Sequence, residues 1–140
     1  LVVSAQPNFH RWAAPGDLYD ERLGERRGLT NRFRDLVDAG AQLAFGSDCM
    51  PLSPLYGVQQ AVTAPEPSQR LTVGKALRAY TSGAAYAGFD EDRMGTVTPG
   101  SVADFAVLSA SPWEVPNGKI SDIDVTMTVS AGDIVFDSGD

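Results

Sequence analysis

The residues with the clearest chemical potential stand at the end of a short apolar run. Gln42 to Phe45 has the length and composition of a buried strand, and it stops at Gly46-Ser47-Asp48. In a parallel α/β fold, ligands bind and catalytic side chains gather at the carboxyl ends of the strands. We therefore expect Asp48 to be the chemically important residue. The alternative is an ordinary strand-to-loop turn, in which Asp48 bonds nearby backbone N–H groups.

Three further side chains could contact a substrate. His10 is the only histidine and could be a ligand, an acid/base or a substrate contact, although a loop histidine is commonly a solvated side chain. Arg26, together with its neighbour Arg27, could bind a substrate carboxylate, or both could cap or form a salt bridge with the following helix. Cys49 adjoins Asp48, but no second His or a Lys lies close in sequence to activate its thiol. That context favours a residue of the pocket wall over a nucleophile.

The helix expected before the strand at 42–45 has its own signals. From residue 30, a polar opening leads to Phe33, Leu36 and Val37, which follow the i, i+3, i+4 spacing of a buried helix face. Gly40 comes next as the expected C-cap. This helix would therefore lead directly into the strand.

A second strand is expected at the start of the chain. Residues 1–5 are apolar and β-branched, and the proline of Gln6-Pro7 ends the run because it lacks the donor that a sheet ladder needs. Residues 8–28 carry glycines and a proline among charged residues. This composition predicts a long irregular loop or a lid rather than a long helix.

Beyond Asp48 the pattern is helical. Residues 55–62 predict a short helix, and residues 63–70 read as a connector with two prolines. The clearest helix begins after Thr72 as N-cap. Its apolar stripe at helical spacing consists of Val73, Leu77, Tyr80 and Ala84.

From Arg93 onward the pattern becomes strand-like. A strand and turn at 95–100 and strands at 103–108, 123–129 and 134–136 are predicted, with a hairpin turn at Gly132-Asp133. Alternation along the second of these strands places Phe105 in the core of the β unit. Asp104 reads as a structural residue that bonds backbone N–H groups. The chain is thus predicted to be an α/β unit followed by an antiparallel β unit.

Composition restricts the class of protein. The chain has 140 residues, 43% of them hydrophobic, which suffices for one core. A net charge of −7 argues against nucleic-acid and anionic-membrane partners, which need clustered Lys and Arg. A single cysteine excludes an internal disulfide, and a cytoplasmic protein is the default expectation. The chain begins inside an expected strand without a Met, which suggests that an N-terminal part has been removed.

These motifs together resemble the C-terminal third of a metal-dependent amidohydrolase. The resemblance covers nearly the whole chain, and its most specific part is the G-x-x-x-x-G-x-x-A-D-F run that begins at Gly95. It is supported by Gly-Ser-Asp at a strand end, by the helix ALRAYTSGAAYA and by the Gly132 hairpin. The Gln6-Pro7 pair and the LGER stretch point to the amidohydrolase 3 subgroup, which is similar to N-substituted formamide deformylases and exoenzyme regulatory proteins.

The resemblance implies a fold and a chemistry. The fold would be the C-terminal part of a TIM-like barrel, its last two strand–helix units in residues 1–92, with strands of a small composite β-sandwich in residues 93–140. Asp48 matches the aspartate that contacts the catalytic metal, expected to be zinc, and takes a proton from the attacking water. The remaining metal ligands would lie upstream of Leu1, so this chain alone is expected to bind no metal tightly and to be inactive.

Two hypotheses of different classes follow. In the first, the intact protein is a metal-dependent hydrolase of C–N bonds in a small-molecule amide or formamide, with Asp48 as metal ligand and general base. In the second, the chain or its parent is a non-catalytic structural or regulatory module. A homo-oligomer is compatible with either. A strand-terminal His-x-His upstream of Leu1 would favour the enzyme.

Overall fold

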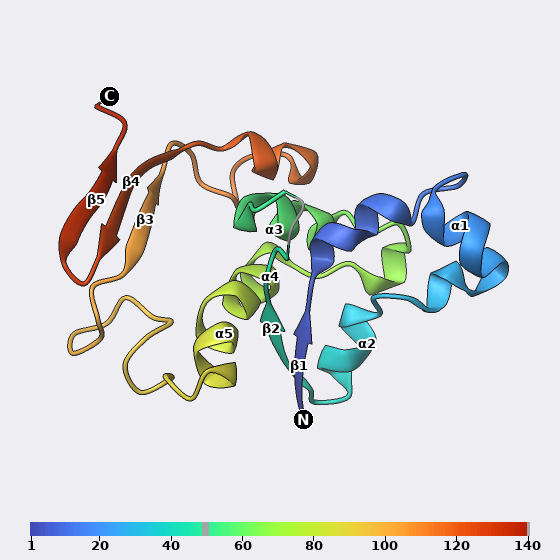
Figure 1. The fold of residues 1–140 in the computed structure, drawn as a ribbon, viewed down its shortest axis with the longest axis horizontal. Coiled ribbons are helices and arrows are strands. Elements are labelled where there is room, and N and C mark those ends of the chain that lie inside the picture. Colours follow the sequence, from blue (N-terminus) through green and yellow to red (C-terminus); the bar gives the residue numbers. More distant parts are fainter. Residues whose placement is uncertain (49–50, 140) are drawn as a thin grey trace.

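The computed structural model describes residues 1–48 and 51–139 and arranges them in two parts. A two-stranded parallel sheet with its helices forms the larger part, and a three-stranded antiparallel sheet lies to one side of it (Figure 1). The predicted order, an α/β unit followed by an antiparallel β unit, is confirmed.

Strands β1 (Val2–Ala5) and β2 (Gln42–Phe45) pair in parallel, with Ala5 opposite Phe45. A parallel pair needs a crossover connection, and short helices supply it here. They are the 3₁₀ helix η1 (Pro7–Trp12), α1 (Leu18–Leu23), the 3₁₀ helix η2 (Gly24–Leu29) and α2 (Phe33–Asp38). Both strands therefore end at the same edge of the sheet, as the chemistry predicted for Asp48 requires.

The segment between β1 and α2 differs from the predicted irregular loop. Residues 8–28 are largely helical, but each helical piece from η1 to η2 is only six residues long. Gly16 and Gly24 separate the pieces with φ of 86° and 53°, a left-handed backbone that glycine adopts readily. The glycines thus prevent one long helix, as expected, while the turns between them still form.

Helix α2 buries the face that its spacing predicts, with Phe33 in the core and Leu36 and Val37 packed against it. It begins later than residue 30 because Asn31 has a φ of 50°, which is outside the helical region. Gly40 ends the segment as expected, with a φ of 81° and its N–H donating to the Val37 carbonyl at 2.9 Å.

The helices after β2 are α3 (Pro54–Val62), the 3₁₀ helix η3 (Pro67–Gln69), α4 (Val73–Tyr80) and α5 (Ser82–Ala87). The cap predicted at Thr72 is confirmed, because its hydroxyl oxygen accepts a hydrogen bond from the Lys75 N–H at 3.3 Å. Ser53 caps α3 in the same way, with the Tyr56 N–H as donor at 3.2 Å. Both caps satisfy N–H groups that a helix leaves without internal partners.

The prediction of one continuous helix through Ala84 is wrong, because Thr81 breaks it with φ −114° and ψ −95°. Helix α5 then packs directly on β2. Gly83 permits this close approach, since a side chain at Gly83 would overlap the Leu43 carbonyl oxygen. The break turns the second helix onto the strand that ends at the candidate site.

One apolar core joins β2 to the helices and reaches the last third of the chain. Ile120 and Ile123, at the 3₁₀ helix η4 (Asn117–Asp122) and just beyond it, belong to this core. The Ser121 N–H also donates to Gln59 Oε1 on α3 at 2.9 Å. The buried core residues are Phe33, Leu43, Phe45, Val58, Ala61, Val62, Leu71, Ala76, Ala79, Ile120 and Ile123.

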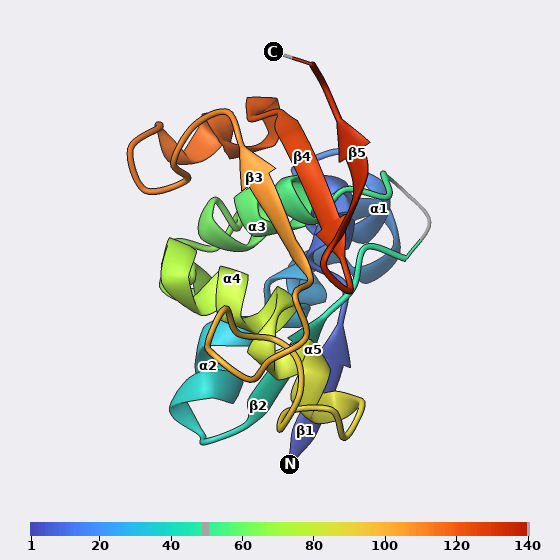
Figure 2. The same cartoon turned by 90° about the vertical axis from the view of Figure 1, so that its left-hand side faces the viewer.

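The antiparallel sheet consists of β3 (Phe105–Leu108), β4 (Val125–Ser130) and β5 (Asp133–Asp137), side by side in chain order (Figure 2). The hairpin turn lies at Ala131-Gly132, one residue earlier than predicted, with φ of 52° and 91°. Two positive φ values are those of a type I′ turn, which matches the twist of the strands. Asp104 has the predicted structural role, since its Oδ1 accepts from the Ala131 N–H at 2.6 Å.

Two predictions for this β unit are wrong. Residues 95–100 form no strand; instead the hydroxyls of Thr96, Thr98 and Ser101 bond one another, the closest pair at 2.9 Å. Phe105 is 40% exposed rather than buried in a core. The reason is that only one layer of sheet is present among the described residues, so alternation along β3 has no second sheet to pack against.

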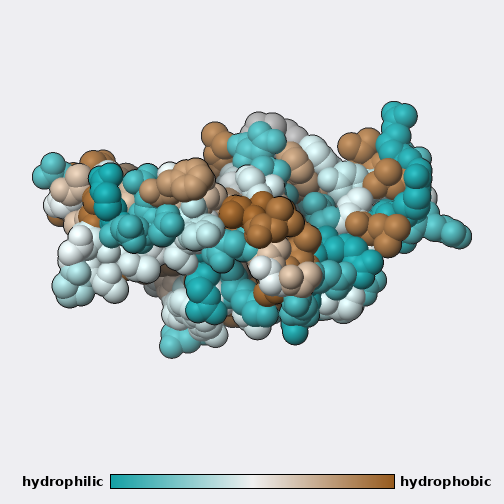
Figure 3. All heavy atoms as spheres, turned by 90° about the horizontal axis from the view of Figure 1, so that it is seen from below, coloured by the Kyte–Doolittle hydropathy of each residue, from teal (hydrophilic) through white to brown (hydrophobic). Residues whose placement is uncertain are grey.

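Hydrophobic residues also lie on the surface of the α/β part. Leu1, Val2 and Phe89 are exposed. Figure 3 views the molecule from the end at which β1 begins and shows hydrophobic atoms gathered at the centre of that face. Within the described ranges, every helix is too short or too polar to cross a membrane.

Candidate functional site

Asp48 lies in the turn that follows β2, after Gly46 and Ser47, as predicted, and it is exposed. The Gly46 N–H donates to the Ala5 carbonyl at 3.1 Å, so the pairing of the two strands continues to the residue that starts this turn. Asp48 has a φ of 57°, a left-handed conformation that aspartate tolerates better than most residues. A carboxylate therefore stands at the carboxyl edge of a parallel sheet, where ligands bind in such folds.

A buried hydrogen-bond network lies beneath this turn. Asn8, which is 0% exposed, donates from Nδ2 to the Pro51 carbonyl at 2.8 Å. Its Oδ1 accepts from the Tyr80 hydroxyl at 3.1 Å, and that hydroxyl also lies 3.4 Å from the Gly46 carbonyl. Side chains from η1 and α4 thus hold backbone groups on both sides of Asp48.

Tyr80 is held as a neutral phenol in this network. Burial raises its pKa to about 12, and a hydrogen bond with the Ser47 side chain opposes part of that shift. Its ring also packs edge-on against Phe45, with centroids 5.6 Å apart. The hydroxyl therefore acts as a hydrogen-bonding group at neutral pH.

His10 is buried rather than solvated, with only 5% of its surface exposed. Its Nδ1 lies 3.1 Å from the Gln60 carbonyl, which can only accept, so Nδ1 carries the hydrogen. Its ring packs on Phe33, with centroids 5.1 Å apart. Burial lowers the pKa of His10, and hydrogen bonds to the backbone of Gln60 and Asn31 offset part of that shift.

A cleft of about 210 Å³ adjoins His10. Arg27 and Asn31 line it from η2 and the segment that follows, and Gln69 closes another side. The Asn31 Nδ2 is buried without a hydrogen-bond partner among the described residues. The residues that line the cleft thus include the buried His10 and Asn31, which carries a buried donor without a partner among the described residues.

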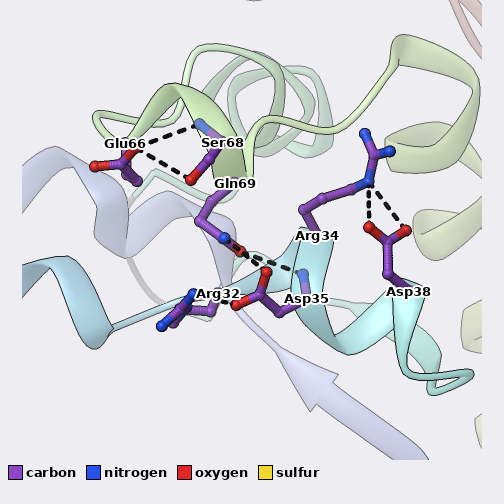
Figure 4. Close-up of polar contacts among 7 residues, drawn as sticks. All are labelled: Arg32, Arg34, Asp35, Asp38, Glu66, Ser68 and Gln69. Atoms are coloured by element: carbon purple, nitrogen blue, oxygen red, sulfur yellow. Dashed lines mark hydrogen bonds and ion pairs between the residues drawn. The ribbon is translucent and has the colours of Figure 1, made fainter.

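The wall of this cleft is fixed by polar contacts between α2 and η3 (Figure 4). Gln69 donates from Nε2 to Asp35 Oδ1 at 2.9 Å and accepts from the Asp35 N–H at 3.3 Å. Asp35 also forms an ion pair with Arg32. These contacts join the start of α2 to the connector that precedes α4.

Arg26 is exposed on η2 and forms no ion pair within residues 1–48 and 51–139. Its neighbour Arg27 pairs with Asp20 on α1, which precedes it in the chain, so the expected salt bridge to the following helix is not the one formed. Cys49, the third predicted substrate contact, lies outside the described residues.

The part of the chain that the structure describes contains no group of three or more His, Cys, Asp or Glu side chains placed to hold a metal ion. Asp48 supplies an exposed oxygen donor of the kind that divalent metals bind, but a catalytic metal usually takes about three protein ligands. The donor present fits a metal site as one member of a larger set.

Asn8 is not among the candidate residues that the sequence indicates, and the apolar pattern assigns Tyr80 only to the core. Asn8 directly follows Gln6-Pro7 at the end of β1, so a polar residue at a strand end was a signal. The apolar stripe predicts a core position for Tyr80, yet a buried tyrosine hydroxyl usually needs a hydrogen-bond partner. The two are 72 residues apart, and only the fold brings them together.

The structure has an α/β part with an exposed carboxylate, Asp48, beyond the carboxyl end of its parallel strands. The chain belongs to the amidohydrolase family, whose family model matches residues 2–136. It is 32% identical over 126 residues to the protein LONG AFTER FAR-RED 3 of Arabidopsis thaliana, covering 81% of this chain and 21% of that protein. It is also 29% identical to N-substituted formamide deformylase of Arthrobacter pascens, covering 84% of this chain and 24% of the enzyme.

The fold is similar to solved structures of the same kind. An uncharacterized metal-dependent hydrolase from Pyrococcus horikoshii superposes with a TM-score of 0.64 at 29% identity, over 84% of this chain and 26% of that chain. The chain thus spans about a fifth to a quarter of the length of these relatives.

Proposed function

We propose that this chain is the C-terminal part of a metal-dependent amidohydrolase that hydrolyses C–N bonds, with Asp48 as a metal ligand and general base. The observation that carries the proposal is the exposed Asp48 carboxylate at the carboxyl edge of paired parallel strands, in a chain of the amidohydrolase family. The substrate class would be a small amide, formamide or related molecule.

The incomplete sheet supports a larger barrel. Strands β1 and β2 pair only with each other among the described residues, whereas parallel sheets are normally larger and covered on both faces. Val3 and Ala5 pack against the core, while Val2 and Ser4 on the opposite face are exposed. We assign residues 1–92 to the last two strand–helix units of a TIM-like barrel, in which this exposed face would be covered.

The antiparallel sheet supports the second part of the assignment. Phe105 and Val107 on β3 and Ile134 and Phe136 on β5 are exposed, which is costly for a sheet that has no partner. We assign residues 93–140 to a small β-sandwich whose second sheet comes from another part of the intact protein.

The proposed chemistry follows from the position of Asp48. When bound, a divalent metal, which we propose to be zinc, supplies Lewis acidity that lowers the pKa of water and polarises the substrate carbonyl. Asp48 would accept the proton from the attacking water and return it to the leaving nitrogen. Because Asp48 is exposed at the carboxyl end of the strands, its carboxylate would be accessible to both the metal and the attacking water.

Substrate contacts are proposed for His10, Arg26 and Cys49. His10 lines the cleft beside Asn31. Arg26 is exposed next to Arg27, which lines the same cleft, so its guanidinium could reach a substrate carboxylate. Cys49 is proposed from its place beside Asp48 in the sequence alone.

The test is metal analysis and turnover of the purified full-length protein. We expect about one or two equivalents of zinc. We also expect turnover of at least one member of a substrate panel, seen as release of formate and amine from an N-substituted formamide or as ring opening of a cyclic amide. Removal of the metal by a chelator should abolish turnover, and added zinc should restore it. A protein that takes up no metal and leaves the whole panel intact would favour the non-catalytic module.

A further inference from the structure

We infer that Asn8 and Tyr80 position Asp48 for its role, through a hydrogen-bonded clamp that holds the backbone on both sides of that residue. The clamp is defined by Asn8, Tyr80 and the two carbonyls of Gly46 and Pro51. This inference deepens the proposed function and rests on it. Neither side chain is assigned to touch substrate or metal, so both are positioning residues.

The clamp contacts the backbone at two points, one before and one after Asp48. Before Asp48, the Gly46 carbonyl lies 3.4 Å from the Tyr80 hydroxyl, and after Asp48, the Pro51 carbonyl accepts from Asn8 Nδ2 at 2.8 Å. Tyr80 has one hydroxyl hydrogen, which is directed to Asn8 Oδ1 at 3.1 Å and shared with the more distant Gly46 carbonyl, and this links the two points. The two ends of the segment that carries Asp48 are therefore joined through side chains, in addition to the covalent chain.

The clamp is rigidly enclosed. Asn8 is completely buried, and a buried amide that loses a partner is left with an unsatisfied polar group. Gly57 on α3 lies so close that a side chain there would overlap both the Tyr80 hydroxyl and Asn8 Oδ1. The Tyr80 ring is held by its edge-on contact with Phe45. Gly57 thus limits the space around both clamp residues.

Asp48 needs such support. Its φ of 57° is uncommon for a residue with a side chain, and such conformations persist when the surrounding structure fixes them. No side-chain hydrogen bond of Asp48 occurs among the described residues, so backbone contacts must determine where its carboxylate lies. The clamp supplies side-chain contacts to the backbone before and after Asp48.

Loss of the clamp should therefore displace Asp48 without removing it. A displacement of about 1 Å in a catalytic group can lower the rate about 100-fold. We expect Tyr80→Phe to lower kcat about 10- to 100-fold while KM changes less than about threefold. Tyr80→Phe keeps the ring that packs on Phe45, so the fold should be retained. The matched control is Tyr86→Phe, whose phenol is exposed on α5.

A spectroscopic measurement on the full-length protein separates this inference from the function on which it rests. The metal is replaced by cobalt(II), whose visible absorption bands depend on the geometry of its ligands. Asp48→Asn should change the bands most. Tyr80→Phe and Asn8→Ala should each give a smaller change, and Tyr86→Phe should give none. The double variant Asn8→Ala/Tyr80→Phe should be no worse in kcat than the worse single variant, because both residues belong to one chain of bonds.

Each outcome decides one claim. If Asp48→Asn leaves the cobalt bands unchanged, or if no cobalt is taken up, the proposed function fails. If Asp48→Asn alters the bands while both Tyr80→Phe and Asn8→Ala retain the wild-type bands and a kcat within twofold, the clamp is overturned and the function stands. Loss of activity in proportion to lost cobalt content, with unchanged bands per bound ion, would also overturn it, because that result indicates destabilisation rather than positioning.

Discussion

Phe33 offers the sharpest test of how the fold supports the site, because its ring joins His10 to the core. The side chain is 1% exposed, and its centroid lies 5.1 Å from that of His10 and 5.0 Å from that of Phe45. Removing a fully buried phenylalanine ring costs about 3–5 kcal/mol, through lost transfer free energy and the cavity left behind. We expect Phe33→Ala to lower the free energy of unfolding by that amount.

This loss is a large part of the stability of a typical domain, which is about 5–15 kcal/mol. With a urea m-value of about 2 kcal/mol per molar, the midpoint should fall by about 2 M. Unfolding is followed by the fluorescence of Trp12, whose indole stacks on Phe9 at 5.0 Å in η1, beside the affected core. Phe33→Leu should cost much less, about 1.5 kcal/mol, because most of the volume remains.

The matched control is Phe89→Ala. Phe89 is 92% exposed, so its loss should change the free energy of unfolding by no more than about 0.5 kcal/mol. A Phe33→Ala protein whose urea midpoint lies within about 0.3 M of the wild type would refute the packing argument. That difference corresponds to about 0.5 kcal/mol, which is expected only for loss of an exposed ring.

Three further predictions follow from the described contacts. The wild type should lose stability as pH falls below about 6.5, because unfolded His10 then binds a proton that the buried imidazole, with its lowered pKa, does not. His10→Gln should lose less free energy of unfolding between pH 7.5 and pH 5.5, and an equal loss in both proteins would contradict the burial argument. Gly83→Ala should destabilise the protein by about 1–3 kcal/mol, because the added methyl group would overlap the Leu43 carbonyl. The control is Gly118→Ala, which has open space around it. Equal unfolding midpoints for the two variants would show that α5 does not pack as described. Residues 1–140 alone should bind zinc with a dissociation constant weaker than about micromolar, and they should self-associate through the free edges of β1 and β2. Calorimetry measures the zinc binding, and light scattering measures the association. Submicromolar, stoichiometric zinc binding by a monomer would show that the site is complete within this chain.

The local features of the fold could be predicted because each depends on a short stretch of sequence. The face of α2 follows from the spacing of Phe33, Leu36 and Val37, and the Thr72 cap follows from one polar side chain before an apolar stripe. The end of β2 at Gly46-Ser47-Asp48 also follows from a local change in composition. In each case the deciding interaction lies within one turn or one strand.

The wrong predictions depend on distant contacts. The break at Thr81 accompanies the packing of Gly83 against Leu43. Residues 43 and 83 are 40 positions apart in the sequence, so the local helical spacing could not predict this contact. Phe105 is exposed because alternation indicates which face a side chain occupies, but not whether another layer covers that face.

The candidate site divides in the same way. Asp48 could be found from its place after an apolar strand, and the family resemblance agrees with the matching family model. The burial of His10 could not be predicted, because it depends on Phe33 and on the Gln60 carbonyl from two other helices. The clamp of Asn8 and Tyr80 likewise requires β1 and β2 to be paired first.

The central claim is that Asp48 is the metal ligand and general base. The most direct measurement is kcat of Asp48→Asn in the full-length protein, with Asp92→Asn, an exposed carboxylate away from the strand ends, as the control. The amide fills the same space but cannot accept the proton from water, so we predict that kcat falls by about three orders of magnitude or more while the protein stays folded. An Asp48→Asn enzyme with near wild-type turnover would contradict the assignment.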